Sequence, residues 1–145
     1  MMKKIQKILL LVFFGVSIST VHATETGSIT VDINGFKNED GTVRVAMANS
    51  RETHPENAKA FREAESMIEG GKVEVVFTDI PYGEYSIRLY HDKNGNKELD
   101  KNVFGVPKEP YGYSNNARAK LSAPSWKKAM FKLDSENVTQ KIDVK

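Results

Sequence analysis

The chain has 145 residues, with 21 Lys and Arg against 19 Asp and Glu, a formal net charge of +2 and no cysteine. This length suits one domain with its own hydrophobic core. The lack of cysteine excludes disulfides, thiolate catalysis, thiolate metal sites and a lipid on an N-terminal cysteine. With 28% charged and 39% hydrophobic residues, the composition is that of an ordinary folded domain and not of a disordered or membrane-embedded chain.

The first 23 residues have the layout of a secretory signal peptide. Three lysines precede an apolar run at residues 8–18, which as a helix would rise only about 16 Å and is therefore too short to span a bilayer. Val21 and Ala23 stand at the −3 and −1 positions of a cleavage site. We expect cleavage after Ala23, with a second candidate site after Ser19.

Cleavage there would change the charge balance. The remaining 122 residues at positions 24–145 carry 18 basic and 19 acidic side chains, a net charge of −1. The positive excess belongs to the signal, so nothing in the balance argues for nucleic acid or an anionic membrane as a partner. We expect an exported protein, periplasmic or secreted, with one domain at residues 24–145 and no membrane span. The sequence leaves its oligomeric state open.

Alternating apolar and polar residues, many of them β-branched, predict a series of short strands. These segments lie at residues 28–34, 42–48, 72–77, 85–91, 129–133 and 138–144. Turn residues at 35–41 predict that the first two strands form a hairpin. A loop at 78–84, bent by proline and glycine, predicts that the third and fourth strands form an antiparallel pair. The turn at 134–137 separates the last two predicted strands.

Residues 49–71 break this alternation. Thr53 and Glu56 fit a capping box around Pro55, apolar residues follow at roughly helical spacing, and two glycines end the segment. We expect one short helix here. The whole pattern predicts an all-β fold, an antiparallel β-sandwich with one short helix and a long loop; a small open barrel is the alternative.

The loop at residues 92–100 presents side-chain oxygens at the spacing of a calcium-binding loop. The candidate metal ligands are Asp92, Asn94, Asn96, Glu98 (through its carbonyl) and Asp100. Glycine stands at the fourth position and not the sixth, Val103 replaces the usual bidentate glutamate, and three lysines balance three acids. Such a site would bind Ca²⁺ weakly, with a Kd of about 10⁻⁴–10⁻³ M. The alternative is a turn whose side chains satisfy its own amides.

A second candidate lies in the long stretch at residues 102–126, which has little periodicity but contains several aromatic residues. Aromatic rings beside amides and a guanidinium suit sugars, peptides or small carboxylates. The same groups can instead tie a long loop to the sandwich. The residues of this ligand site or structural knot are His91, Tyr111, Tyr113, Asn115, Asn116 and Arg118.

Four segments carry a family resemblance. They are DIPYGEY at residues 79–85, YHDKNGN at 90–96, FGVP at 104–107 and YGYSNNAR at 111–118. In this order they resemble the bacterial domain of unknown function 2141 family, over about residues 27–144. The resemblance implies a small exported protein with a transthyretin-like or carboxypeptidase-regulatory-like sandwich and no assigned activity. The positions that match its signature are His91, Asp92, Asn94, Asn96, Asp100, Asn115, Asn116 and Arg118.

The chain lacks the common catalytic motifs of serine hydrolases, zinc proteases and phosphate-binding loops. We therefore expect a non-catalytic binding or accessory module with no cofactor beyond weakly bound Ca²⁺. Its partner would be a small ligand, a glycan or an envelope protein. The alternatives are a Ca²⁺-stabilised structural domain and a cell-envelope hydrolase that uses His91 and Asp92. Neighbours on a strand point to opposite faces, which argues against direct pairing of those two residues.

Overall fold

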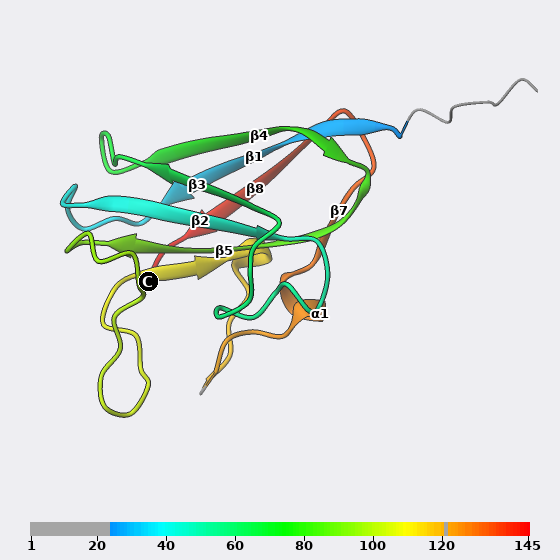
Figure 1. Ribbon diagram of the computed structural model, residues 1–145. Helices are drawn as coiled ribbons and strands as arrows, with labels where there is room; N and C mark the ends of the chain where they lie inside the picture. The colour runs from blue at the N-terminus through cyan, green and yellow to red at the C-terminus, as the bar shows by residue number, and fades with distance from the viewer. Residues whose placement is uncertain (1–23, 121) are drawn as a thin grey trace, which may run out of the picture.

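The computed structural model describes residues 24–120 and 122–145 (Figure 1), so the predicted signal peptide lies outside the described residues. The elements in chain order are β1 (Thr26–Asn34), β2 (Thr42–Ala48), β3 (Arg62–Ser66), β4 (Val73–Pro81), β5 (Gly83–Asp92), β6 (Tyr111–Tyr113), the 3-10 turn η1 (Ser114–Asn116), α1 (Trp126–Ala129), β7 (Phe131–Leu133) and β8 (Asn137–Asp143). In the part of the chain described, no helix is long and apolar enough to cross a membrane.

The strands form two sheets that face each other, as in a sandwich (Figure 1). One sheet has the order β4-β1-β8, and the other has the order β3-β2-β5-β6 with β7 also paired to β5. All pairs are antiparallel except β1 and β8, which run parallel. The all-β prediction is confirmed at the level of two packed sheets, and the prediction of purely antiparallel pairing is wrong for β1 and β8.

The core lies between the sheets. Side chains of a strand alternate between its two faces, so the apolar positions of β1, β2 and β5 all point inward. Fully buried side chains from both sheets meet there, among them Ile29, Val31, Ile33, Val43, Val45, Met47, Ile80, Ile87, Leu133 and Ile142. Burial of each contributes about 1.5–3 kcal/mol, and this packing holds the sheets together without disulfides.

The predicted strand pairs are wrong, although most of the predicted strands exist. β1 and β2 lie in different sheets, as do β4 and β5, and β7 pairs with β5 while β8 pairs with β1. The turn before β2 crosses between the sheets at Gly41, where φ is +70° and an added Cβ would lie 2.0 Å from the carbonyl oxygen of Asp92. At the passage from β4 to β5, the Tyr85 hydroxyl donates to the Pro81 carbonyl at 2.6 Å. The alternation of apolar and polar residues predicts which face of a strand is buried, but it does not predict the strand with which it pairs.

The helix predicted within residues 49–71 is wrong. The Thr53 hydroxyl accepts the backbone N–H groups of Asn49 and Ser50 in a turn, and β3 follows as a strand along the edge of β2. Backbone pairing with that edge outweighs the helix propensity of the Arg-Glu-Ala-Glu run. The short helix of the fold is α1, so β7 begins two residues later than the strand predicted at 129–133.

The sandwich is closed along one side. Tyr111 in β6 exchanges two backbone hydrogen bonds of 3.2 Å with Lys145, which follows β8. Side chains from η1 cover the adjacent edge of β8. β3 and β4 form the outer edges on the other side. This arrangement exposes the outer face of the five-stranded sheet, and the loops around it turn that face into a groove.

Candidate functional site

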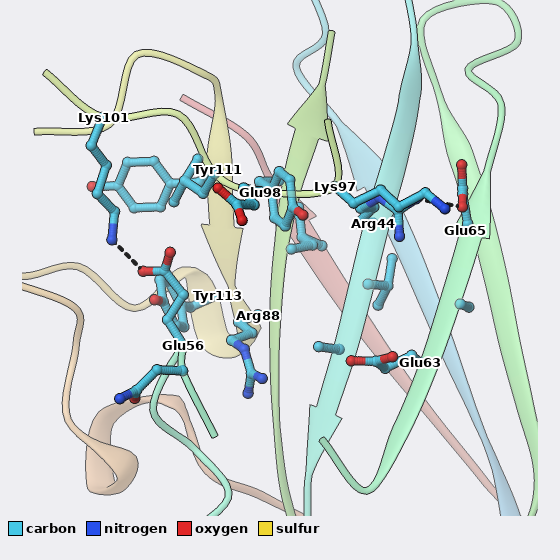
Figure 2. A pocket seen from close by; sticks show the side chains of 17 residues that line it. Arg44, Glu56, Glu63, Glu65, Arg88, Lys97, Glu98, Lys101, Tyr111 and Tyr113 are labelled. Atoms are coloured by element: carbon cyan, nitrogen blue, oxygen red, sulfur yellow. Dashed lines mark hydrogen bonds and ion pairs between the residues drawn. The ribbon is translucent and has the colours of Figure 1, made fainter. Parts of the chain in front are cut away.

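The outer face of the five-stranded sheet carries a groove of about 900 Å³, which we call the sheet-face groove. Its floor consists of side chains that alternate away from the core, and loops at residues 56–57 and 97–101 form part of its wall (Figure 2). The charged and aromatic residues that line it are Arg44, Glu56, Glu63, Glu65, Arg88, Tyr90, Lys97, Glu98, Lys101, Tyr111 and Tyr113.

Three tyrosines from two neighbouring strands line the groove. Strand register places Tyr111 opposite Tyr90 and Tyr113 opposite Arg88, and the Tyr111 and Tyr113 rings lie edge to face at 6.2 Å. None of the three hydroxyls has a hydrogen-bond partner among the described residues, and none is sealed from solvent. Burial raises the pKa of Tyr90 and of Tyr113 to about 12. These phenols therefore remain neutral groups that can both donate and accept.

Three ion pairs border the tyrosines. Arg44 binds Glu65 at 2.8 Å and Asp92 at 3.1 Å, so one guanidinium bridges the carboxylates of β3 and β5. At the other side, Lys101 binds Glu56 at 2.7 Å, and Figure 2 shows the Glu56 carboxylate between Lys101 and Tyr113. These pairs use charges of the groove for contacts within the protein.

Arg88 holds a loop. One of its terminal nitrogens donates to the carbonyls of Thr53 and His54 at 3.1 and 3.3 Å, and the other donates to the carbonyl of Ala58 at 3.1 Å. Burial lowers the pKa of Arg88 below its usual value, and the neighbouring Tyr113, Glu63 and Glu56 oppose this only in part. The guanidinium fixes the 53–58 segment beside the groove and is not available as an open anion site.

The remaining charges of the groove have no partner in the part of the chain that the structure describes. Glu63 on β3, and Lys97 and Glu98 on the loop after β5, make no side-chain hydrogen bond or ion pair with any described residue. The groove is lined by four basic and four acidic side chains, so its charges balance. The groove therefore presents charged side chains that a ligand can reach, without a strong net electrostatic field.

The predicted metal loop is closed by its own hydrogen bonds. The Asp92 carboxylate is fully buried and accepts the N–H groups of Gly95 at 2.8 Å and Lys97 at 2.9 Å, besides the Arg44 side chain. Burial alone would raise the pKa of Asp92, but these bonds outweigh burial and hold it below its usual value. These hydrogen bonds are those expected for the alternative, a turn whose side chains satisfy its own amides.

The other predicted ligands of this loop also bind one another. The Asp100 carboxylate accepts the side-chain amides of Asn94 at 2.8 Å and Asn96 at 2.9 Å. Glu109, which the sequence did not single out, is buried and accepts the N–H groups of Lys93 and Asp100 across the base of the loop. Within the described ranges, no cluster of three or more His, Asp or Glu side chains is arranged to hold a metal.

His91 and Asp92 point to opposite faces of β5. His91 is buried in the core, where its Nε2 binds the Asp40 carbonyl and its ring meets the edge of Phe36, while its Nδ1 has no partner among the described residues. Asp92 lies on the other face with Arg44. Both side chains have 0% exposure, so they do not form a joint hydrolytic site.

Asn115, Asn116 and Arg118 form a structural knot along β8. The Asn116 side chain accepts the N–H of Asp143 at 2.9 Å, and Arg118 donates to the Asp143 carbonyl at 2.7 Å. Asn115 donates to the carbonyl of Met130 at 2.9 Å. The side chains of Asn116 and Arg118 thus serve the edge of β8 in place of another strand, while that of Asn115 ties η1 to the residue before β7. Of the six residues predicted as one site or knot, only Tyr111 and Tyr113 line the sheet-face groove.

The chain matches one known family. Residues 31–141 match the family described as "Uncharacterized protein conserved in bacteria (DUF2141)". The chain belongs to the DUF2141 family. The resemblance predicted from the sequence is thus confirmed, and the matched range contains all the lining residues of the groove, the 92–100 loop and Asn115, Asn116 and Arg118 of the knot. No curated protein and no solved structure matches the chain.

A buried serine–histidine pair of this DUF2141 domain was also missed from the sequence. His54 binds the Ser86 hydroxyl through Nδ1 and the Pro124 carbonyl through Nε2, each at 2.8 Å, and its ring packs against Trp126. Because a carbonyl only accepts, Nε2 carries the proton and Nδ1 accepts from Ser86. Ser86 is 1% exposed, so the pair anchors two loops to β5 and does not face a substrate.

Proposed function

We propose that this DUF2141 protein is an exported, non-catalytic binding module whose sheet-face groove holds a neutral, hydroxyl-rich ligand of the glycan class. The observation that carries the proposal is the row formed by Tyr90, Tyr111 and Tyr113, whose hydroxyls have no hydrogen-bond partner among residues 24–120 and 122–145. Tyrosine combines a ring face that packs on the apolar side of a sugar with a hydroxyl that exchanges hydrogen bonds with it.

The charge pattern favours a neutral ligand. Four basic and four acidic side chains balance across the groove, and the ion pairs of Arg44 and Lys101 engage half of these residues. A polyanion or polycation would meet no net opposing field there. Glu63 and Glu98 remain open, and a carboxylate is a strong acceptor for sugar hydroxyls.

Titration calorimetry with neutral hexasaccharides tests the proposal, with cellohexaose, chitohexaose, xylohexaose and mannohexaose as probes. We expect saturable binding of at least one of them. Glu63→Ala should weaken it about tenfold through loss of a charge-assisted hydrogen bond. Glu74→Ala is the matched control, because Glu74 is likewise an exposed strand glutamate but lies on the other sheet.

Absence of binding to all four probes, or an equal loss in both variants, would contradict the proposed ligand class. The hydrolase alternative has less support, since His91 and Asp92 are buried on opposite faces. The export proposed here rests on the signal-peptide layout of the first 23 residues.

A further inference from the structure

We propose that a second hollow extends the sheet-face groove and takes an aromatic substituent at one end of the glycan ligand. We call it the apolar hollow. This inference rests on the proposed function, because it concerns the same ligand and two of the same tyrosines. It names the ligand more narrowly, as a neutral glycan that carries an aryl group. The supporting observations are the lining of the hollow, its order, its continuity with the groove and its size.

The lining of the apolar hollow is mostly apolar. The hollow has a volume of about 280 Å³, and its apolar side chains outside the tyrosines are Leu99, Phe104, Val106, Pro107, Ala119 and Ala123. Phe104 is 86% exposed and Val106 55%, so both side chains are open to a ligand. Exposed apolar side chains that gather around a concave surface mark a binding site, whereas scattered single ones are normal.

The loop that carries Phe104 and Val106 is held in shape by its own hydrogen bonds. The Asn102 side chain accepts the N–H groups of Phe104 at 2.9 Å and Val106 at 3.0 Å. The Asn102 backbone exchanges further bonds with Val106 and Gly105, each of 2.9 Å. This wall of the hollow is therefore formed before a ligand arrives, which lowers the entropy cost of binding.

The apolar hollow continues the sheet-face groove. Tyr111 and Tyr113 line both, as do Glu56, Leu99 and Lys101. The ion pair between Lys101 and Glu56, of 2.7 Å, thus lies where the two meet, and Figure 2 shows it beside the two tyrosines. A ligand that lies along the tyrosines passes from the charged lining of the groove to the apolar lining of the hollow.

Size and lining select the occupant. Pockets that hold a whole small-molecule ligand have volumes of about 300–1,000 Å³. The groove, at about 900 Å³, lies in this range, while the hollow, at about 280 Å³, lies just below it and suits one group of a larger ligand. Three rings line the hollow, those of Phe104, Tyr111 and Tyr113, and aromatic rings pack favourably on one another. A further sugar would instead bring its hydroxyls among apolar side chains, where they lose water without gaining enough partners.

Titration calorimetry with two matched series tests the inference. The probes are the methyl and the phenyl β-glycosides of cellotriose, chitotriose, xylotriose and mannotriose. For the trisaccharide that binds best, we expect the phenyl glycoside to bind about tenfold more tightly than the methyl glycoside, because its ring leaves water. Phe104→Ser should remove this advantage without changing the affinity for the methyl glycoside, since Phe104 lines the hollow but not the groove.

A second pair of variants provides the matched control. Val106→Ser should reduce the advantage of the phenyl glycoside to about threefold, because part of the apolar contact is lost. Val76→Ser should leave the advantage at its parent value. Val76 is 50% exposed, close to the 55% of Val106, but it lies on β4 in the other sheet.

The hexasaccharide titrations separate failure of this inference from failure of the proposed function. If a hexasaccharide binds but the phenyl glycosides have no advantage over the methyl glycosides, the inference is overturned and the groove remains. If no hexasaccharide binds, both are overturned. An unaffected Phe104→Ser variant, or an equal loss in Val76→Ser and Val106→Ser, would also overturn the inference. So would self-association of the protein that Phe104→Ser abolishes, without a preference for phenyl glycosides.

Discussion

Tyr111 in β6 lies directly opposite Tyr90 in β5, in a strand pair that extends to Tyr113 opposite Arg88. This register, and not any one residue, creates the row of phenols in the sheet-face groove. Arg88 at the same time holds the loop beside the groove through three backbone carbonyls. The aromatic row and the arginine that fixes the loop beside it are therefore supplied by the same two strands.

Removal of one hydroxyl from this row should weaken ligand binding without affecting the fold. Tyr111→Phe is expected to reduce affinity for the bound hexasaccharide by about fivefold to tenfold, the value of one hydrogen bond. Its thermal midpoint should stay that of the parent, because the hydroxyl bonds to none of the residues that the structure describes. Tyr82→Phe is the control, since Tyr82 lies outside the groove. Equal affinities for Tyr111→Phe and the parent would contradict contact by this hydroxyl.

Alkaline titration should reveal two groove tyrosines, Tyr90 and Tyr113, that ionise above the usual pKa of a phenol. The pKa values of Tyr90 and Tyr113 lie near 12 because burial disfavours their phenolates, compared with the usual value of 10.0. The folded protein therefore holds these protons above pH 10 while the unfolded chain releases them. Stability should fall as pH rises from about 10 to 12. Phenolate absorbance followed with pH, together with denaturant unfolding, measures both effects; a single transition near pH 10 for all tyrosines would contradict them.

Asp92→Asn should destabilise the fold by about 3 kcal/mol, because it leaves Arg44 without a buried partner and places an amide against backbone donors. The folded pKa of Asp92 lies below its usual value of 3.8, so its contribution is present above that pH and is lost as pH falls below it. Denaturant unfolding over this pH range should show less acid sensitivity in Asp92→Asn than in the parent. Asp134→Asn, at an exposed turn, is the control and should change neither quantity.

Calcium should leave the melting temperature unchanged. The oxygens of Asp92 and Asp100 already accept hydrogen bonds from the loop's own amides and from Arg44. A cation would have to displace these bonds, and the loop carries no net negative charge to favour it. Thermal melts in millimolar Ca²⁺ and in EDTA test this expectation. A higher midpoint in Ca²⁺ that Asp100→Asn abolishes would instead support the calcium-stabilised domain.

Strand positions could be predicted from the sequence to a large extent, but sheet membership could not. β2 has the predicted bounds, residues 42–48, because its alternation is regular and one of its faces is buried. β3 was missed because its Arg-Glu-Ala-Glu sequence is typical of a helix. It forms a strand because it pairs with the edge of β2. β2 offers this edge because the chain crosses from one sheet to the other at Gly41.

Only part of the candidate site could be predicted from the sequence, again because the sequence does not reveal which strands pair. Tyr111 and Tyr113 stood out because aromatic and polar residues are dense around them. Arg44 and Glu63 did not, since their strands meet only in the folded sheet. The available signal was the face of β5 that carries Ser86, Arg88 and Tyr90. Large side chains such as those of Arg88 and Tyr90 on the face away from the core indicate a surface that can bind a ligand.

Amide NMR titration of the protein with the best-bound neutral hexasaccharide tests the central claim most directly. The account predicts chemical-shift changes that gather on β5 and β6 around Tyr90, Tyr111 and Tyr113 and on β3 around Glu63, while β1, β4 and β8 remain unaffected. Changes confined to the β4-β1-β8 sheet, or no changes at saturating concentrations of all four hexasaccharides, would contradict a glycan site in the sheet-face groove.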